Sequence, residues 1–161
     1  MKVRDIMQTK LQSVSPDVPV LEAVTTMAEQ HVSALPVLDI HGAIVGVIST
    51  TDVLQAEAEA DDAEARAALF ESSNVSDLMT ARARTIEASA TIADAAQQML
   101  YLEVHRLFVV EDEKLVGVVS QTDIVRAVAA QLRLAEVQAE GAPAHHAGRR
   151  HRRPGRIQPP T

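Results

Sequence analysis

The chain has 161 residues and no cysteine, which excludes disulfide bonds, thiolate metal sites and cysteine nucleophiles. Hydrophobic residues make up 47% of the chain but aromatic residues only 2%, so the core must consist of aliphatic side chains and methionine. The formal net charge of −7 is uneven, because all 22 acidic residues precede residue 141 and five arginines follow it. No apolar run is long enough to span a membrane and no leader opens the chain, so we expect a cytoplasmic protein without membrane insertion.

The first half is predicted to contain a short strand, a helix, two buried strands and a second helix. Ser15 to Asp17 starts the first helix, and apolar residues then recur at helical spacing. Asp39 and Gly42 suit the backbone of a turn between the two buried strands. The predicted ranges are 10–15 for the short strand, 35–38 and 44–48 for the buried pair, and 49 onward for the second helix.

The second half repeats this order. The predicted elements are a short strand at 85–86, a helix at 91–100, paired strands at 107–110 and 115–119, and a last helix from Asp123 to about Glu140. Residues 55–72, between the halves, are rich in alanine and acids, which favours a helical connector. Gly141 ends the last helix, and the proline and glycine residues beyond it predict disorder over 142–161.

Two phrases occur twice in the chain. GVISTTD at 46–52 returns as GVVSQTD at 117–123, which is 71 residues later. VRDIM at 3–7 returns as VSDLM at 75–79, which is 72 residues later. Matching opening and closing phrases at nearly one spacing indicate a tandem duplication of one structural unit.

The closing phrase places hydroxyls and an acid where a buried strand ends and a helix begins. Free backbone N–H groups at a helix start favour an anion such as phosphate. Ser49 and Thr51 offer hydroxyl donors, and the Asp52 carboxylate can accept from the two vicinal hydroxyls of a ribose; Ser120, Thr122 and Asp123 repeat the set. The same Ser-x-x-Asp pattern is also a helix cap, worth about 1 kcal/mol without any ligand. Both interpretations stay open at this point.

In these phrases, and in VSPD at 14–17 and ALPVLD at 34–39, residues 3 to about 130 resemble a tandem pair of cystathionine β-synthase (CBS) domains, often called a Bateman module. The resemblance implies an α+β sandwich of two β-α-β-β-α units, packed sheet to sheet about a pseudo-twofold axis. It also implies two clefts between the units that bind adenosine-containing ligands. On this basis we assign residues 1–56 and 74–130 to the repeats, 57–73 to the linker, 131–141 to a helix extension and 142–161 to the tail.

The resemblance implies particular roles for residues in each cleft. The acids would contact ribose and the neighbouring hydroxyls would contact phosphate. Backbone groups around Ser13 and Val14, and around Thr85 and Ile86, would hydrogen-bond the adenine edge. Phe108 stands where the first repeat has Pro36, and its ring is expected either to stack on a base or to block the cleft.

The cations available for a phosphate are few. Arg84 and Arg106 are the main candidates, and Lys10, Arg82 and Arg126 are the others. Several of them belong to the second repeat, which predicts clefts of unequal strength. Few cations in an acidic body favour AMP or ADP over ATP, which would need Mg²⁺.

The sequence predicts no enzyme, because no histidine is placed to activate a hydroxyl and no phosphate loop of the Gly-x-x-x-x-Gly-Lys type occurs. The histidines are scattered, so no metal site is expected. We expect a regulatory homodimer that senses adenine nucleotide, serves energy sensing and signals to an unidentified partner protein. Helix residues for the dimer surface are Val20, Val24, Met27, Ile124 and Val128, which could also be core. The alternatives are a ligand-free interaction module and a nucleic-acid-linked regulator acting through the arginine-rich tail, although we do not expect nucleic-acid binding.

Overall fold

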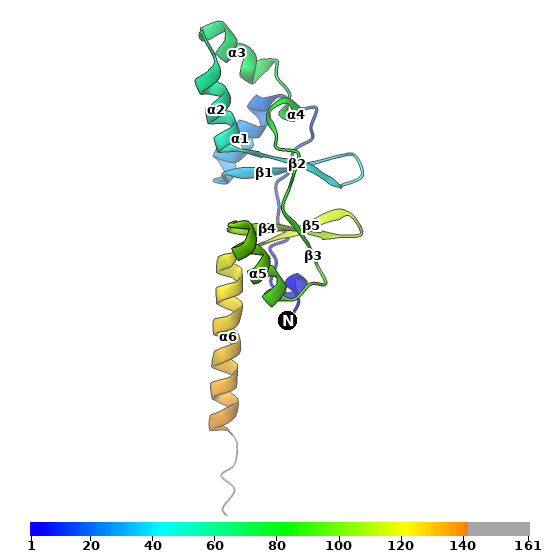
Figure 1. Ribbon diagram of the computed structural model, residues 1–161, viewed down its shortest axis with the longest axis vertical. Helices are drawn as coiled ribbons and strands as arrows, with labels where there is room; N and C mark the ends of the chain where they lie inside the picture. Colours follow the sequence, from blue (N-terminus) through cyan, green and yellow to red (C-terminus); the bar gives the residue numbers. More distant parts are fainter. Residues whose placement is uncertain (142–161) are drawn as a thin grey trace, which may run out of the picture. The chain divides into compact units, whose positions relative to one another are not determined.

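The computed structural model describes residues 1–141 (Figure 1). Residues Met1–Val128 form one compact unit, and a second unit begins at Ala129. The prediction of disorder over 142–161 lies outside the described residues.

The first repeat contains most of the expected elements in the expected order. Its strands β1 (Ala34–Leu38) and β2 (Ile44–Ser49) form an antiparallel two-stranded sheet, joined by the predicted turn with Gly42 at φ +81°. The remaining elements are the 3-10 helix η1 (Val3–Asp5), α1 (Val20–Gln30) and α2 (Thr50–Glu59), and the connector after them forms α3 (Ala63–Glu71). Helices α2 and α3 confirm the helical interpretation of the acidic connector.

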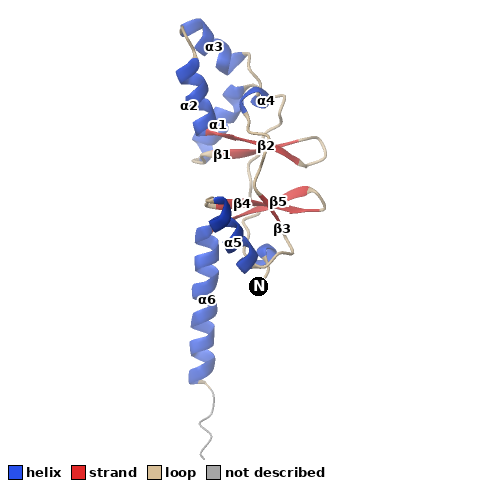
Figure 2. Cartoon of the chain, in the orientation of Figure 1, coloured by secondary structure: helices blue, strands red, loops and turns tan. Residues whose placement is uncertain are grey.

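The second repeat adds a three-stranded sheet in the order β3-β4-β5 (Figure 2). Strand β3 (Thr85–Glu87) runs parallel to β4 (Arg106–Glu111), and β4 runs antiparallel to β5 (Lys114–Ser120). The helices are α4 (Val75–Leu78), α5 (Ile92–Leu102) and α6 (Gln121–Glu140), and α6 ends before Gly141 as predicted. The mixed α/β architecture expected from the sequence is confirmed.

The predicted start of the first helix is wrong, because α1 begins at Val20 rather than at Ser15 to Asp17. Pro19 is the N-cap residue, and its φ of −59° and ψ of 148° are typical of polyproline II rather than of a helix. A proline also disfavours helical geometry in the residue before it, here Val18. The helix therefore starts only after Pro19.

The short strand predicted at 10–15 is also wrong. Only Val14 pairs there, in a single parallel bridge with Val37. In the second repeat the Phe108 N–H donates to the Arg84 carbonyl oxygen at 2.9 Å, and β3 forms beside β4. Pro36 stands at the position of Phe108 and has no N–H to donate. The backbone hydrogen bonding beside β1 therefore ends at Val14, and the first repeat has no strand equivalent to β3.

Each opening phrase packs against the other repeat. Val3 is fully buried in the core that contains Leu107 and Val109 of β4, and its N–H donates to the Ala90 carbonyl at 2.8 Å. Val75 is fully buried in the core of the first repeat, beside Val37 and Ile48. Each repeat therefore buries a valine from the opening phrase of the other, and this hydrophobic burial holds the two repeats together.

Candidate functional site

The first closing phrase forms a complete helix cap at the start of α2. The Ser49 hydroxyl accepts a hydrogen bond from the Asp52 N–H at 3.2 Å. The Asp52 Oδ2 atom in return accepts from the Ser49 N–H at 2.8 Å and from the Ser49 hydroxyl at 2.9 Å. These reciprocal bonds are a capping box, so the cap interpretation of this phrase is confirmed.

The second closing phrase forms the same arrangement at the start of α6. The Ser120 N–H and hydroxyl each donate to Asp123 Oδ2 at 2.8 Å, and the Asp123 N–H donates to the Ser120 hydroxyl at 3.2 Å. Asp123 is buried, whereas Asp52 is only partly buried. Both serine hydroxyls are thus used within the fold, while Thr51 and Thr122 are exposed on the first turns of their helices.

A cavity of about 390 Å³ lies between the repeats. Pro36 of β1 and Phe108 of β4 both line it, and Lys10 and Arg106 add two cationic side chains. This volume falls in the range of about 300–1,000 Å³ that is usual for small-molecule sites. The ring of Phe108 is therefore a wall of an open cavity and does not fill it.

Seven further residues from several parts of the chain complete the lining of the cavity: Leu11, Gln12, Gln30, Val32, Ala34, Leu35 and Val118. No backbone hydrogen bond to the Gln12 carbonyl is found in residues 1–141, which follows from the missing N–H of Pro36. The proline in ALPVLD was the available signal, because it predicts an unpaired carbonyl on the neighbouring segment.

The backbone groups expected to meet an adenine are partly used by the fold. The Val14 N–H donates to the Pro36 carbonyl at 3.1 Å, and the Val14 carbonyl accepts from the Leu38 N–H at 2.9 Å. The Thr85 carbonyl accepts from the Gln98 side chain at 2.9 Å, and Ile86 lies in the β3–β4 ladder. Both backbone groups of Val14 are thus used within the fold, whereas the neighbouring Ser13 is exposed.

The structure brings together some of the predicted site residues and separates others. Arg106 and Lys10 line the cavity, whereas Arg84 is exposed and does not line it. The hydroxyls and acids of the two closing phrases do not line it either. However, Ala34 on the cavity wall pairs with Ser49, and the Ser33 carbonyl accepts from the Thr50 N–H at 2.9 Å. The start of α2 is therefore next to a residue of the cavity wall, and so is the start of α6, where Ser120 pairs with Arg106 and the Gln121 N–H donates to the His105 carbonyl at 3.0 Å.

Within residues 1–141, no group of three or more histidine, aspartate or glutamate side chains is arranged to hold a metal ion. Within the same residues, no helix has both the length and the apolar character needed to cross a lipid bilayer. The cytoplasmic location stays a prediction.

The chain belongs to the CBS domain family, whose model matches it twice, at residues 3–59 and 75–130. The two matches correspond to the two repeats of the structure. The tandem arrangement inferred from the repeated phrases is thereby confirmed.

Known proteins share both the sequence pattern and the fold. The CBS domain-containing protein YhcV of Bacillus subtilis is 28% identical over 123 residues, which cover 76% of this chain and 81% of YhcV. The crystal structure of CBSX2 of Arabidopsis thaliana in complex with AMP is 30% identical, with a TM-score of 0.67, over 80% of this chain and 97% of that one. The CBS domain pair of MJ0100, in complex with 5′-methylthioadenosine and S-adenosylmethionine, shares the fold at 23% identity and a TM-score of 0.64, over 81% and 98% of the two chains.

Proposed function

We propose that this chain is a non-catalytic regulatory module that binds an adenine nucleotide, AMP above all, between its two repeats. The observation that carries the proposal is the cavity between Pro36 and Phe108, with two cationic side chains on its wall. The AMP complex of CBSX2, a relative at 30% identity, supports the choice of ligand.

The charge of the cavity favours a monophosphate. Lys10 and Arg106 can together balance one phosphate group, which carries a charge of about −1.5 to −2 at neutral pH. A triphosphate would bring further negative charge toward a chain whose net charge is already −7. We therefore rank AMP first and ADP next, and expect ATP to require Mg²⁺. A module that separates AMP from ATP would report the energy state of the cell.

The remaining parts of the nucleotide have partners near the same cavity. Pro36 and Phe108, which both line the cavity, offer apolar ring faces against which an adenine ring can pack. The Gln12 carbonyl can accept a hydrogen bond from the adenine amino group. Asp52, at the start of the adjoining helix α2, can accept from the ribose hydroxyls through its Oδ1 atom, with Thr51 beside it.

We further propose that the chain is a homodimer whose apolar helix faces meet. A groove of about 320 Å³ between α1 and α2 is lined by Val24, Val53 and Leu54, and one of about 250 Å³ between α5 and α6 by Leu100 and Val125, among others. The exposed fractions are 67% for Leu54, 73% for Leu100 and 68% for Val125. Of the residues expected at this surface, Val20 is instead a fully buried core residue, whereas Met27 is buried but still lines the first groove. Nucleotide binding would act on a partner protein by changing this assembly.

The first experiment is calorimetric titration with AMP, ADP and ATP after removal of any carried-over nucleotide. Lys10→Ala and Arg106→Ala should each weaken AMP binding about tenfold or more, because each removes a charged hydrogen bond worth about 1.5–3 kcal/mol. Lys114→Ala is the matched control, since Lys114 is exposed and does not line the cavity. No heat with any nucleotide would remove the proposal and leave the ligand-free interaction module.

The dimer has its own experiment. Leu54→Glu should shift the sedimentation coefficient from that of a dimer to that of a monomer, because it places a charge in the apolar groove. Ile40→Glu is the matched control, because Ile40 is 95% exposed in the β1–β2 turn and does not line either groove. A monomeric wild type would refute the dimer. The arginine-rich tail of the nucleic-acid alternative lies outside the described residues.

A further inference from the structure

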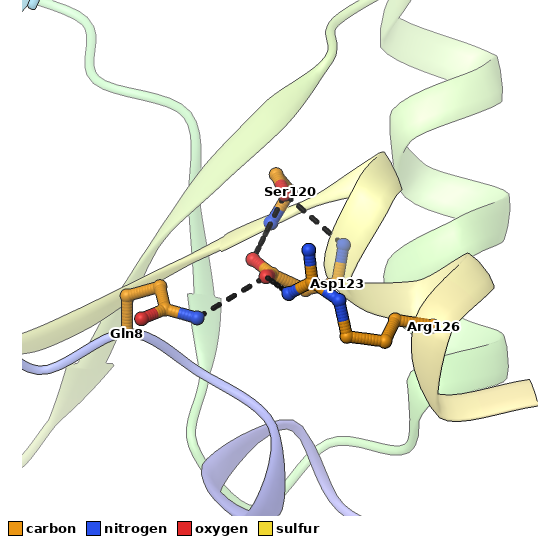
Figure 3. A network of polar contacts seen from close by, with 4 residues as sticks. All are labelled: Gln8, Ser120, Asp123 and Arg126. Carbon is orange, nitrogen blue, oxygen red and sulfur yellow. Dashed lines mark hydrogen bonds and ion pairs between the residues drawn. The ribbon is translucent and has the colours of Figure 1, made fainter. Parts of the chain in front are cut away.

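The two acids of the closing phrases differ in how many of their acceptor positions are occupied. Asp123 Oδ2 accepts from the Ser120 N–H and hydroxyl, as the cap requires. Its Oδ1 atom accepts from the Gln8 side-chain amide at 3.2 Å and lies 3.6 Å from the Arg126 guanidinium (Figure 3). A carboxylate offers about four lone-pair positions. Three of these positions on Asp123 thus accept hydrogen bonds from groups of the chain, and the Arg126 guanidinium forms an ion pair with the same Oδ1 atom.

Asp52 has the contacts of the helix cap but neither of the other two contacts found at Asp123. Its Oδ2 atom carries the two bonds from Ser49, while its Oδ1 atom has no hydrogen-bond or ion-pair partner among residues 1–141. That atom is not among the buried atoms that lack a partner, so it is open to solvent. Two acceptor positions on Asp52 are therefore available, which matches the two vicinal hydroxyls of a ribose.

The difference comes from two substitutions between the repeats. The residue after the opening methionine is Gln8 in one phrase and Thr80 in the other, and the threonine hydroxyl makes no hydrogen bond to Asp52. The residue three positions after the acid is Arg126 in one repeat and Gln55 in the other, and the Gln55 amide donates to Glu59 at 3.1 Å. Neither contact of Asp123 has a counterpart at Asp52.

We propose that Gln8 and Arg126 make Asp123 a structural carboxylate, so that the chain binds one nucleotide and does so through Asp52. This inference rests on the proposed function for its ligand, but its structural half stands without any ligand. Gln8 follows the opening phrase that packs in the core of the second repeat, so its bond to Asp123 fastens that segment. A ribose at Asp123 would have to displace the partly buried, charge-assisted hydrogen bond from Gln8, whereas a ribose at Asp52 displaces water.

A double-mutant cycle tests the structural half without nucleotide. Urea unfolding is measured for Gln8→Ala, Asp123→Ala and the double variant. Non-additive shifts of the unfolding midpoint are expected, because either substitution alone removes the hydrogen bond that the two residues share. The control cycle of Thr80→Ala with Asp52→Ala should be additive. Additive shifts in the first cycle would overturn the proposal. If Asp123→Ala does not fold, Gln8→Ala alone must lower the midpoint more than Thr80→Ala, and equal midpoints would overturn the proposal.

Calorimetric stoichiometry with AMP tests the other half. The wild type is expected to bind one AMP per chain, Asp52→Asn to lose that binding, and Asp123→Asn to keep it. Two AMP molecules per chain, or loss of binding in Asp123→Asn with Asp52→Asn unaffected, would overturn the assignment. Absence of AMP binding in the wild type would refute the proposed nucleotide function, and the double-mutant cycle would then decide the structural role of Asp123 by itself.

Discussion

Met79 packs directly over Gly46, so closely that a Cβ atom at residue 46 would lie 2.7 Å from the methionine sulfur. The same Cβ would lie 2.8 Å from the Thr80 carbonyl oxygen. Gly117 has the same relationship to Met7 of the other opening phrase, at 2.7 Å. The glycine that opens each closing phrase and the methionine that ends each opening phrase therefore belong to one contact between repeats.

Replacing Gly46 with alanine should destabilise the protein by about 1–3 kcal/mol, because the strand and the opening segment cannot both keep their places. Shortening Met79 would not relieve the clash with the Thr80 carbonyl, since that oxygen belongs to the backbone. Urea unfolding of Gly46→Ala measures the loss. Gly141→Ala is the control, because its nearest neighbour would be 3.4 Å away. Equal stabilities of the two variants would contradict the contact.

Because each opening phrase packs in the core of the other repeat, a mutation in one opening phrase should weaken the other repeat. Val3→Ala should destabilise the protein by about 2 kcal/mol and raise hydrogen exchange in β4 and β5, because Val3 is fully buried in that core. Val75→Ala should raise exchange in β1 and β2 instead. Hydrogen exchange measured by mass spectrometry on peptides from the two sheets distinguishes the two variants. Faster hydrogen exchange in β1 and β2 of Val3→Ala, with β4 and β5 unchanged, would show that the first opening phrase does not pack in the core of the second repeat.

The capping boxes predict a measurable contribution from each serine hydroxyl. Ser49→Ala should lower the free energy of unfolding by about 1 kcal/mol, because the Asp52 N–H loses its acceptor at the start of α2. Ser120→Ala should cost about as much at α6. Ser89→Ala is the control, since Ser89 is exposed and its hydroxyl makes no hydrogen bond in the described residues. Ligand-free unfolding in urea is the measurement, and a change as small as that of the control would argue against the caps.

Local patterns in the sequence were sufficient for the order of elements in both repeats. Alternating short apolar runs and helical spacing located β1, β2, β4, β5 and α5, because these elements bury continuous faces. The repeated phrases located the duplication and the caps. The predicted start of the first helix was wrong because the backbone at Pro19 is restricted. The strand predicted at 10–15 was wrong because Pro36 has no N–H to pair with it.

The contacts between repeats could not be predicted in the same way. Nothing in the sequence around Val3 or Val75 says which repeat buries it, because both cores are aliphatic and accept valine equally well. The bond from Gln8 to Asp123 joins residues 115 positions apart, and neither residue carries a local signal of the other. The repeat made Asp52 and Asp123 look equivalent, and only the three-dimensional contacts separate them.

The capping box of α5 predicts how acid affects the protein. The hydrogen bond from the Thr91 hydroxyl, at 2.7 Å, together with that from the Thr91 N–H, holds the pKa of Asp94 below its ordinary value of 3.8. Since the folded pKa is the lower one, the stabilisation is present above pH 3.8 and is lost as the pH falls through the folded pKa.

The stability of the wild type should therefore exceed that of Asp94→Asn near neutral pH, and the difference should shrink as the pH is lowered below 3.8. Urea unfolding between pH 7 and about pH 3 measures it. Thr91→Val removes the hydroxyl that is the main cause of the lowered Asp94 pKa. In that background, Asp94→Asn should therefore reduce the stability at neutral pH by less than it does in the wild type. A difference between wild type and Asp94→Asn that stays constant down to about pH 3 would mean that the carboxylate does not stabilise the helix through its charge.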